Sequence, residues 1–327
     1  MNRRTWLAAA GAAALSIAAG PLRAAAPYPN RPIRLVVPFL PGSSPDNTAR
    51  ALASELGPLI GETIVVENVP GAGGIIGANV LKRAAPDGYT LGILANAHVI
   101  NIHTYPNLPY DPTRDFTSIA AISGGPTVLA VPAAAPYGSA QELIAAMKQA
   151  PDELNFGSGG KGSIAHLAVE LLLHQTGTRA MHIPYKGATE LIPAMLSGQT
   201  HFGMPVLGTA VPYLRSGQLR ALAVSSSERS PFFPEVPTLA EVLPPGYVID
   251  NWSGLFAPAH LPDELTRRLF AGIAKVQAGG GLDDLMNTNA GELRRSTSPA
   301  QFGELVASET QRYGKLMGAI GMSGLAS

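Results

Sequence analysis

The sequence predicts an α/β protein of two domains, joined by two crossing segments and facing each other like a clamshell. Short apolar runs alternate with helical patterns from Arg31 onward, which is typical of mostly parallel sheets with helices on their faces. The chain has 327 residues, enough for one large or two medium domains. Each half of the chain also carries a strand, a Gly/Ser loop and a helix start, in that order.

The first of these units lies close to the N-terminus of the folded part. An apolar run at Ile33–Phe39 predicts a buried strand, and Gly42 and Ser43 permit a tight turn. Ser44 is a candidate helix cap, and Pro45 suits the first turn of a helix. Free backbone N–H groups and the helix dipole at such a turn favour an anion. We therefore interpret this loop as half of a ligand site.

The rest of the chain predicts the boundaries of the two domains. The turn-rich segment after Asn96 leads to a first crossing, and the extended segment Val248–Ala257 predicts a second crossing back. These crossings place one lobe at residues 27–124 plus 249–327, and the other at 125–248. Within the second lobe, a short strand ends in a Gly/Ser loop at Ser158–Ser163, and a helix follows until Gly177. This loop is the predicted counterpart of the first.

The composition excludes several classes of function. Lys and Arg together number 23 and Asp and Glu also 23, so no basic surplus favours nucleic-acid binding. The absence of cysteine excludes thiol catalysis, cysteine metal sites and disulfides. The seven histidines show no spacing typical of a metal site, and no pattern predicts a cofactor. No Gly-x-Ser-x-Gly elbow is present, so the chain is not predicted to be an enzyme.

The first residues predict an export signal. Arg3 and Arg4 form a basic start, Leu7–Ala19 is an apolar segment, and small residues follow at Ala24–Ala26. We expect a signal peptide at residues 1–24, removed to give a periplasmic protein. The arginine pair is compatible with either the general or the twin-arginine export route.

Two glycine-rich segments imitate nucleotide-binding motifs without matching them. In the loop Ser158–Ser163, Lys161 is followed by Gly162 rather than by Ser or Thr, so it is not a P-loop. Either it binds an anion through its backbone or it is a structural turn. The segment Gly71–Gly77 has Ile76 where a dinucleotide fingerprint needs its third glycine, so tight turning and close packing explain it better.

Several side chains near strand ends are candidates for the site, each with a structural alternative. Asp46 either contacts a ligand or bonds loop N–H groups. Asn96 and His98 follow a strand end, where cleft residues gather. Lys186 either supplies a positive charge to a carboxylate or is a solvated lysine, and Tyr185 suits a pocket wall.

Taken in order, the motifs resemble those of the periplasmic solute-binding receptors of tripartite tricarboxylate transporters, also called Bug-type receptors. The resemblance is carried by PFLPGSSPDNTAR, VVENVPGAGGIIGA, PDGYTL, LPYDPTRDF, LNFGSGGKGSIAHLA, HIPYKGA, LRALAVSSSERS, FPEVPTLAE and WSGLFAPAHLP. It implies a two-lobed type II periplasmic-binding fold with a deep cleft for a small carboxylate. It also implies that backbone N–H groups of Phe39–Asp46 and Ser158–Ser163 hold part of that carboxylate.

The chain departs from the family pattern at two places. Its first loop has Gly42-Ser43 where a glycine pair is usual, and His201 and Pro205 occupy positions where acidic residues are common. An acidic side chain in the cleft could hold an amino group. Its absence favours a plain or aromatic carboxylate over an amino acid as the ligand.

The sequence therefore predicts a monomeric periplasmic receptor that passes a di- or tricarboxylate or an aromatic acid to a membrane permease. A periplasmic sensor that presents its ligand to a signalling receptor is the first alternative, and an enzyme on the same fold is a weaker one. The predicted ligand-binding residues are Phe39, Gly42, Ser43, Ser44, Asp46, Asn96, His98, Ser158, Gly159, Ser163, Tyr185, Lys186 and Met204.

Overall fold

The structure is a computed structural model that describes residues 28–244 and 246–324. The predicted signal peptide, residues 1–24, lies outside the described residues. From Arg31 onward the chain forms one compact unit with two β-sheets. Within the described part of the chain, no helix is both long and apolar enough to cross a membrane.

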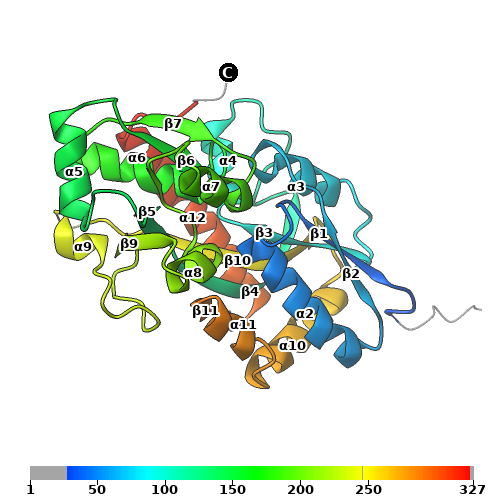
Figure 1. Ribbon diagram of the computed structural model, residues 1–327. Helices are drawn as coiled ribbons and strands as arrows, with labels where there is room; N and C mark the ends of the chain where they lie inside the picture. Colours follow the sequence, from blue (N-terminus) through cyan, green and yellow to red (C-terminus); the bar gives the residue numbers. More distant parts are fainter. Residues whose placement is uncertain (1–27, 245, 325–327) are drawn as a thin grey trace, which may run out of the picture. The chain divides into compact units, whose positions relative to one another are not determined.

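The first sheet has six strands in the order β11-β4-β10-β3-β1-β2 (Figure 1). β1 pairs in parallel with both β2 and β3, whereas β10 runs antiparallel to both β3 and β4. The parallel part agrees with the predicted alternation of strands and helices, and the antiparallel part is made by the crossing strands. The bounds are β1 Ile33–Val37, β2 Ile64–Asn68, β3 Thr90–Ala95, β4 Phe116–Pro126, β10 Asp250–Pro258 and β11 Glu292–Leu293.

Helices cover both faces of the first sheet. The connection from β1 to β2 contains α2, and the connection from β2 back past β1 to β3 contains α3. Right-handed crossovers in opposite directions place these two helices on opposite faces. α10 packs on α2, and α12 packs on α4 and β4. The bounds are α2 Ser44–Ile60, η1 Ala72–Gly74, α3 Ile75–Lys82, α4 Ala97–Thr104, α10 Asp263–Ala278, α11 Asp283–Thr288 and α12 Pro299–Ala319.

The second sheet has five strands in the order β7-β6-β8-β5-β9. β6 is parallel to β7 and β8, and β5 is antiparallel to β8 and β9. The strands are β5 Val128–Pro132, β6 Asn155–Ser158, β7 Met181–Pro184, β8 Phe202–Gly203 and β9 Leu219–Val224. The helices are α5 Ala140–Gln149, α6 Ile164–Thr176, α7 Ala188–Leu196, α8 Leu207–Arg215 and α9 Leu239–Val242.

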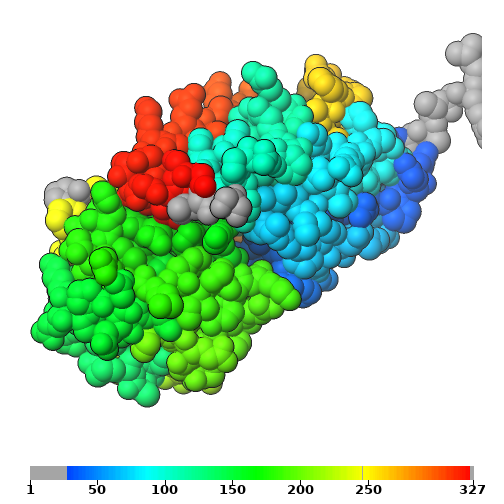
Figure 2. Space-filling view, turned by 90° about the horizontal axis from the view of Figure 1, so that it is seen from above, coloured from blue at the N-terminus to red at the C-terminus, as the bar shows by residue number. Residues whose placement is uncertain are grey.

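Two long strands connect the sheets. β4 and β10 run side by side across the middle of Figure 1, paired from Asp250 opposite Pro126 to Pro258 opposite Phe116. Beyond this ribbon the chain passes into the second sheet through β5. In Figure 2 the green residues of the second sheet gather on one side, while N-terminal and C-terminal residues share the other. The fold is therefore the two-lobed α/β architecture that the sequence predicts.

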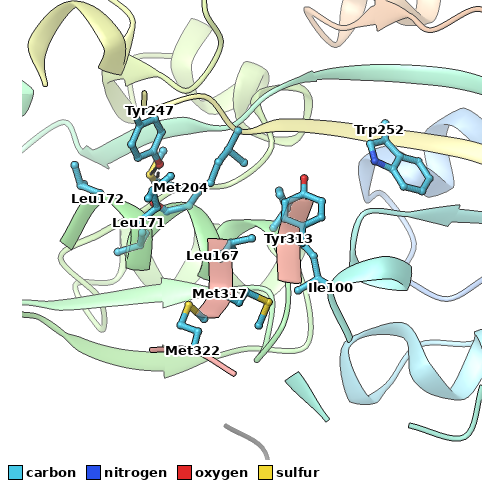
Figure 3. Close-up of a cluster of buried hydrophobic side chains, with 14 of the residues drawn as sticks. Ile100, Leu167, Leu171, Leu172, Met204, Tyr247, Trp252, Tyr313, Met317 and Met322 are labelled. Atoms are coloured by element: carbon cyan, nitrogen blue, oxygen red, sulfur yellow. Dashed lines mark hydrogen bonds between the residues drawn. The ribbon is translucent and has the colours of Figure 1, made fainter. Parts of the chain in front are cut away.

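One apolar core extends from the second sheet to the C-terminal helix. Figure 3 shows Met317 of α12 near Leu167 of α6, and Met204 beside Tyr247. The Tyr247 hydroxyl is buried and donates a hydrogen bond to the Ala168 carbonyl at 2.6 Å. Satisfied in this way, the hydroxyl costs little to bury. This core includes residues of α6 and α12 and so holds these two helices in place.

Several local predictions need correction. The cap of α2 is Ser43 rather than Ser44, because Ser44 already has a helical position. The segment after Asn96 was expected to be irregular, but it forms α4, which is buried on most sides and so lacks the one-sided apolar pattern of a surface helix.

Candidate functional site

Five helices begin at one cavity between the two sheets. The cavity has a volume of about 80 Å³, and each of these helices contributes residues at its N-terminus to the wall. One such residue per helix is Ser44 of α2, Ala97 of α4, Ala165 of α6, Ala188 of α7 and Val206 before α8. α2 and α4 belong to the first sheet and the other three to the second. Both lobes therefore present positive helix ends to the same space.

Backbone N–H groups at these helix ends are available to a ligand. Among the described residues, no acceptor pairs with the N–H groups of Ser44, Ala97, Ile164, Ala165 and Ala188, and all five residues line the cavity. The first N–H groups of a helix have no partner within the helix. Each helix also carries the equivalent of about half a positive charge at this end. The cavity is thus suited to a carboxylate or another small anion.

No charged side chain takes part in the wall. The described residues that line the cavity include no Asp, Glu, Lys, Arg or His. Apolar side chains make up much of the wall, among them Phe39, Leu40, Ile164 and Val206. The arrangement can neutralise a carboxylate through N–H dipoles and can pack an apolar ligand body. It offers no counter-ion for an ammonium group.

A larger hollow of about 680 Å³ lies elsewhere, along the outer side of α2 and β2. It is open to solvent, and it faces the C-terminal end of α2 at Gly57 and Gly61. The dipole at that helix end disfavours anions. The small enclosed cavity is therefore the better candidate for the functional site.

The structure brings part of the predicted site to the cavity and places the rest around it. The predicted residues that line the cavity are Phe39, Ser43, Ser44, Asn96, Gly159 and Ser163. The predicted residues outside its wall are Gly42, Asp46, His98, Ser158, Tyr185, Lys186 and Met204. Direct contact of any of them with a ligand stays a prediction.

Asp46 is buried and holds the first loop in shape. Its carboxylate accepts hydrogen bonds from the Gly42 N–H at 2.9 Å, from the Asn68 amide at 2.8 Å and from Arg50 Nε at 3.0 Å. Burial alone would raise the pKa of Asp46, but these hydrogen bonds hold it below its ordinary value. Asn68 also donates to the Phe39 carbonyl at 3.0 Å. The carboxylate is therefore occupied in fixing the loop that carries Phe39 and Ser43.

Ser158 plays a similar part in the second loop. Its hydroxyl lies 2.6 Å from Nε2 of His182, donates to the Gly160 carbonyl and accepts from the Gly160 N–H. His166 lies against His182 and accepts the Gly162 N–H at its Nδ1, 3.4 Å away. Burial, followed by the proximity of His166 and Lys161, lowers the pKa of His182 to about 3. The ring is neutral at physiological pH and fixes the loop behind the cavity.

The Asn96 side chain is used within the fold although its residue lines the cavity. Its amide oxygen accepts the Trp252 N–H at 2.7 Å, and its NH₂ donates to the Asp250 carbonyl at 3.1 Å and the Tyr313 hydroxyl at 2.7 Å. All of its strong hydrogen-bonding positions serve β10 and α12. Asn96 thus ties the N-terminus of α4 to the crossing strand, leaving its backbone to face the cavity.

His98 lies in an aromatic cluster away from the cavity wall. Its ring stacks on Tyr110 at 5.0 Å and meets Phe116 edge-on at 4.6 Å. Nε2 lies 3.1 Å from the Pro112 carbonyl, so it carries the proton, and the buried Nδ1 has no partner among the described residues. Burial lowers the pKa of His98 to about 4. The residue is a neutral part of the core.

The remaining candidates surround the second loop. Tyr185 is half-buried, and its backbone N–H donates to the Ser158 carbonyl at 3.0 Å. Lys186 is exposed, and its backbone N–H donates to Glu190 at 3.0 Å. Met204 is fully buried in the core near Tyr247. In this structure none of these side chains reaches the cavity wall.

The two lobes are in contact at the second loop, Ser158–Ser163. The Tyr105 hydroxyl, on the side of the first sheet, donates to the Lys161 carbonyl at 3.4 Å. Gly162 has φ +76°, and a Cβ there would come within 2.7 Å of Oδ1 of Asn101. Only a glycine lets the loop approach α4 so closely. The structure therefore has the lobes in contact around the cavity.

Sequence reasoning missed Asn251 and Thr209, which also line the cavity. Thr209 is in the first turn of α8. Asn251 lies on β10, in the segment already assigned to the second crossing. The available signal was a polar side chain in the predicted second crossing, but Asp250 and Ser253 of the same strand give the same signal.

A cavity between two lobes that are joined by a strand ribbon, with helix N-termini from both lobes in its wall, is typical of a clamshell ligand-binding protein. The family model "Tripartite tricarboxylate transporter family receptor" matches residues 48–322, and the chain belongs to this family.

Relatives with known sequence or structure agree with this assignment. The chain is 34% identical over 291 residues to the UPF0065 protein in the tcbD-tcbE intergenic region of Pseudomonas sp. strain P51, covering 89% of this chain and 86% of that one. The solved structure of periplasmic binding protein BugD is similar with TM-score 0.86 at 29% identity, over 91% of this chain and 100% of BugD.

Two solved relatives contain bound carboxylates. R. palustris Rpa4515 with adipate has TM-score 0.87 at 32% identity, over 91% of this chain and 100% of that one. MatC from Rhodopseudomonas palustris with bound malate has TM-score 0.84 at 29% identity, over 88% of this chain and 99% of that one. The whole two-lobed fold is therefore shared with binding proteins of this family.

Proposed function

We propose that this protein is a periplasmic receptor that captures a small organic carboxylate between its lobes and delivers it to a membrane permease. The observation that carries the proposal is the convergence of five helix N-termini on one enclosed cavity without a charged side chain. Unpaired N–H groups from both lobes can bind one anion only when the lobes are together. Ligand binding therefore stabilises the closed state.

The family and its solved members support the ligand class. Two of them were solved with adipate and with malate, both small carboxylates. The membrane permease and the periplasmic location rest on the family name and on the predicted signal peptide at residues 1–24. We further propose the lobe boundaries 27–124 plus 249–327 and 125–248, which fall at the ends of the β4–β10 ribbon. The receptor acts as a monomer and without catalysis.

A thermal-shift screen of the mature chain tests the proposal. The panel contains mono-, di- and tricarboxylates, aromatic acids, amino acids and a few nucleotides. A ligand at 100 times its Kd adds about 2.7 kcal/mol to the free energy of unfolding, which raises the Tm visibly. A shift with one carboxylate class supports the receptor function. A shift with a nucleotide or a neutral compound alone contradicts it.

A ligand sensor would share the fold and the carboxylate. The protein that co-purifies with the ligand-loaded receptor separates these two functions. Permease subunits would indicate transport, and a signalling receptor would indicate sensing. Catalytic turnover of the bound acid, followed by NMR, would instead support the enzyme alternative.

A further inference from the structure

Six polar residues line the cavity: Ser43, Ser44, Asn96, Ser163, Thr209 and Asn251. Ser44, Ser163 and Thr209 are partly exposed, and the other three are buried. Asn96 and Ser163 are committed to the fold, since Asn96 bonds β10 and α12 and the Ser163 hydroxyl accepts the His166 N–H at 3.3 Å. Ser43 and Asn251 are only 7% and 5% exposed. The Ser43 hydroxyl is buried without a partner among the described residues, and the Asn251 amide lines the cavity and takes part in no hydrogen bond with the described residues. A buried polar group without a partner is unfavourable in the folded protein. Ser43 and Asn251 are therefore the two buried residues of the wall whose side chains remain available to a ligand.

Asn251 and Ser43 lie on different elements of the fold. Ser43 stands at the N-terminus of α2, beside the N–H groups that suit a carboxylate. Asn251 lies on the crossing strand β10, opposite Gly125 of β4. It is the one amide side chain of the described cavity wall whose hydrogen-bonding groups are not committed elsewhere. A ligand with a second polar group can use it without competing for the helix ends.

The fold fixes the position of Asn251 from both sides. The Asn96 side chain bonds the carbonyl of Asp250, the preceding residue, and the N–H of Trp252, the following one. The Asp250 carboxylate pairs with Arg294 at 3.1 Å. An amide held in this way is pre-organised for a ligand, which reduces the entropy lost on binding. Since β10 is one strand of the ribbon that joins the lobes, a contact here also connects the ligand with lobe closure.

We propose that Asn251 determines the ligand specificity of the cavity. Its neutral amide donates to an acceptor oxygen at the second end of the ligand, such as that of another carboxylate. An amino group is excluded because the wall offers no carboxylate to neutralise a buried ammonium. The ligand class is accordingly a small dicarboxylate without an amino group. This inference rests on the proposed function of the cavity as a carboxylate site.

The test compares ligands that differ only in the amino group. Calorimetry measures Kd for three pairs: succinate and aspartate, glutarate and glutamate, and adipate and 2-aminoadipate. Wild-type protein is expected to bind the plain member of at least one pair at least tenfold more tightly. Asn251→Asp changes one NH₂ to an oxygen. It is expected to raise the Kd of that dicarboxylate at least tenfold and to improve the relative affinity for its amino counterpart.

Matched variants separate specificity from charge and folding. Asn287→Asp introduces the same charge at an exposed position of α11 and is expected to change Kd less than twofold. Asn251→Ala removes the amide. It is expected to raise the Kd of the dicarboxylate at least fivefold, while binding of the amino acid stays weak. If circular dichroism shows that Asn251→Asp does not fold, Asn251→Ala alone tests the inference.

The outcomes distinguish this inference from the proposed function. If wild-type protein binds a plain dicarboxylate and both Asn251 variants leave its Kd within twofold, the specificity role of Asn251 is overturned while the receptor function stands. If the wild-type protein binds the amino member of a pair more tightly, the inference also fails. If it binds no carboxylate at all, the proposed function and this inference fail together.

Discussion

The imidazole ring of His166 stacks on that of His182, with ring centroids 3.9 Å apart and an angle of 15° between the planes. Each ring also holds one part of the second loop, since His182 contacts the Ser158 hydroxyl and His166 accepts the Gly162 N–H. The pair therefore acts as a support behind the helix end that faces the cavity. Its contribution to binding is indirect and can be measured.

Replacing His182 by Gln is expected to weaken ligand binding although the side chain does not line the cavity. The variant loses the stacked ring and the 2.6 Å contact with Ser158, so the loop is held less firmly. We expect at least a fivefold rise in Kd and a loss of about 1–2 kcal/mol in the free energy of unfolding. Calorimetry and urea unfolding measure both. His174→Gln, at an exposed position on α6, is the control and should change neither quantity appreciably.

Mild acid is expected to destabilise the protein through His98. Burial lowers its pKa from 6.5 to about 4, so the unfolded chain binds a proton at a pH where the folded chain does not. The stability from this group is present above pH 6.5 and is lost as the pH falls toward 4, with a slope of up to about 1.4 kcal/mol per pH unit. Urea unfolding at several values between pH 5 and 7.5 measures the slope.

His98→Gln should reduce this slope, because the substitute does not titrate. The part that remains comes from His182, whose pKa is also lowered, to about 3. His201→Gln, at an exposed position, should leave the slope as it is in the wild type. An equal slope in wild type and His98→Gln would contradict the assignment of the acid sensitivity to His98.

Replacing Asp46 by Ala is expected to be costly for stability. The carboxylate is 1% exposed and accepts bonds from Gly42, Asn68 and Arg50, so its loss removes three charge-assisted hydrogen bonds that hold the first loop. We expect a loss of about 3 kcal/mol, measured by chemical unfolding, together with weaker ligand binding. Glu264→Ala removes an exposed, ion-paired carboxylate and should cost less than about 1 kcal/mol. Similar losses in both variants would contradict the buried role of Asp46.

Because the pKa of Asp46 is lowered in the folded protein, its contribution belongs to the pH range above its ordinary value of 3.8. It is lost as the pH falls below 3.8 through the folded-state pKa. The Asp46→Ala variant should therefore approach the wild-type stability in strong acid.

If backbone N–H groups bind the anion, Gly159→Leu should impair ligand binding more than Lys186→Ala does. A Leu side chain at Gly159 must enter the cavity or displace Gly187, whose Cα would lie 3.5 Å from the new Cβ. Gly159→Leu should therefore abolish binding, whereas Lys186→Ala removes an exposed charge outside the wall and should raise Kd only a few fold. Gly303→Leu is the matched control, since a Cβ at Gly303 meets nothing within 4 Å. Stronger loss in Lys186→Ala than in Gly159→Leu would assign the anion binding to the lysine.

Local signals made much of the fold predictable from the sequence. The start of α6 at Ser163, the capping box of Thr238 with Glu241, and the start of α12 at Ser298 all depend on residues within three positions of one another. The two Gly/Ser loops predicted the starts of two helices that face the cavity for the same reason. Two matching halves and two crossing segments were then enough to give the clamshell.

The roles of individual side chains depend on contacts between distant parts of the chain. Asp46 accepts a hydrogen bond from Asn68, which is 22 positions away, and Asn96 is satisfied by Trp252 and Tyr313 across more than 150 positions. No local pattern indicates that these polar groups are already used. The same limit hid Asn251, whose availability follows from the absence of such a contact among the described residues.

The unpaired N–H groups of the cavity also bear on how such a site can evolve. Every amino acid except proline supplies the same N–H, so substitutions at Ser44, Ile164 or Ala188 cannot delete the anion-binding groups one by one. Proline already stands at position 45, the second residue of α2. Mutations can thus exchange the apolar wall and the amide on β10 while the affinity for a carboxylate persists. A site of this construction can adopt new acids as nutrients by a few substitutions, without passing through a form that binds none.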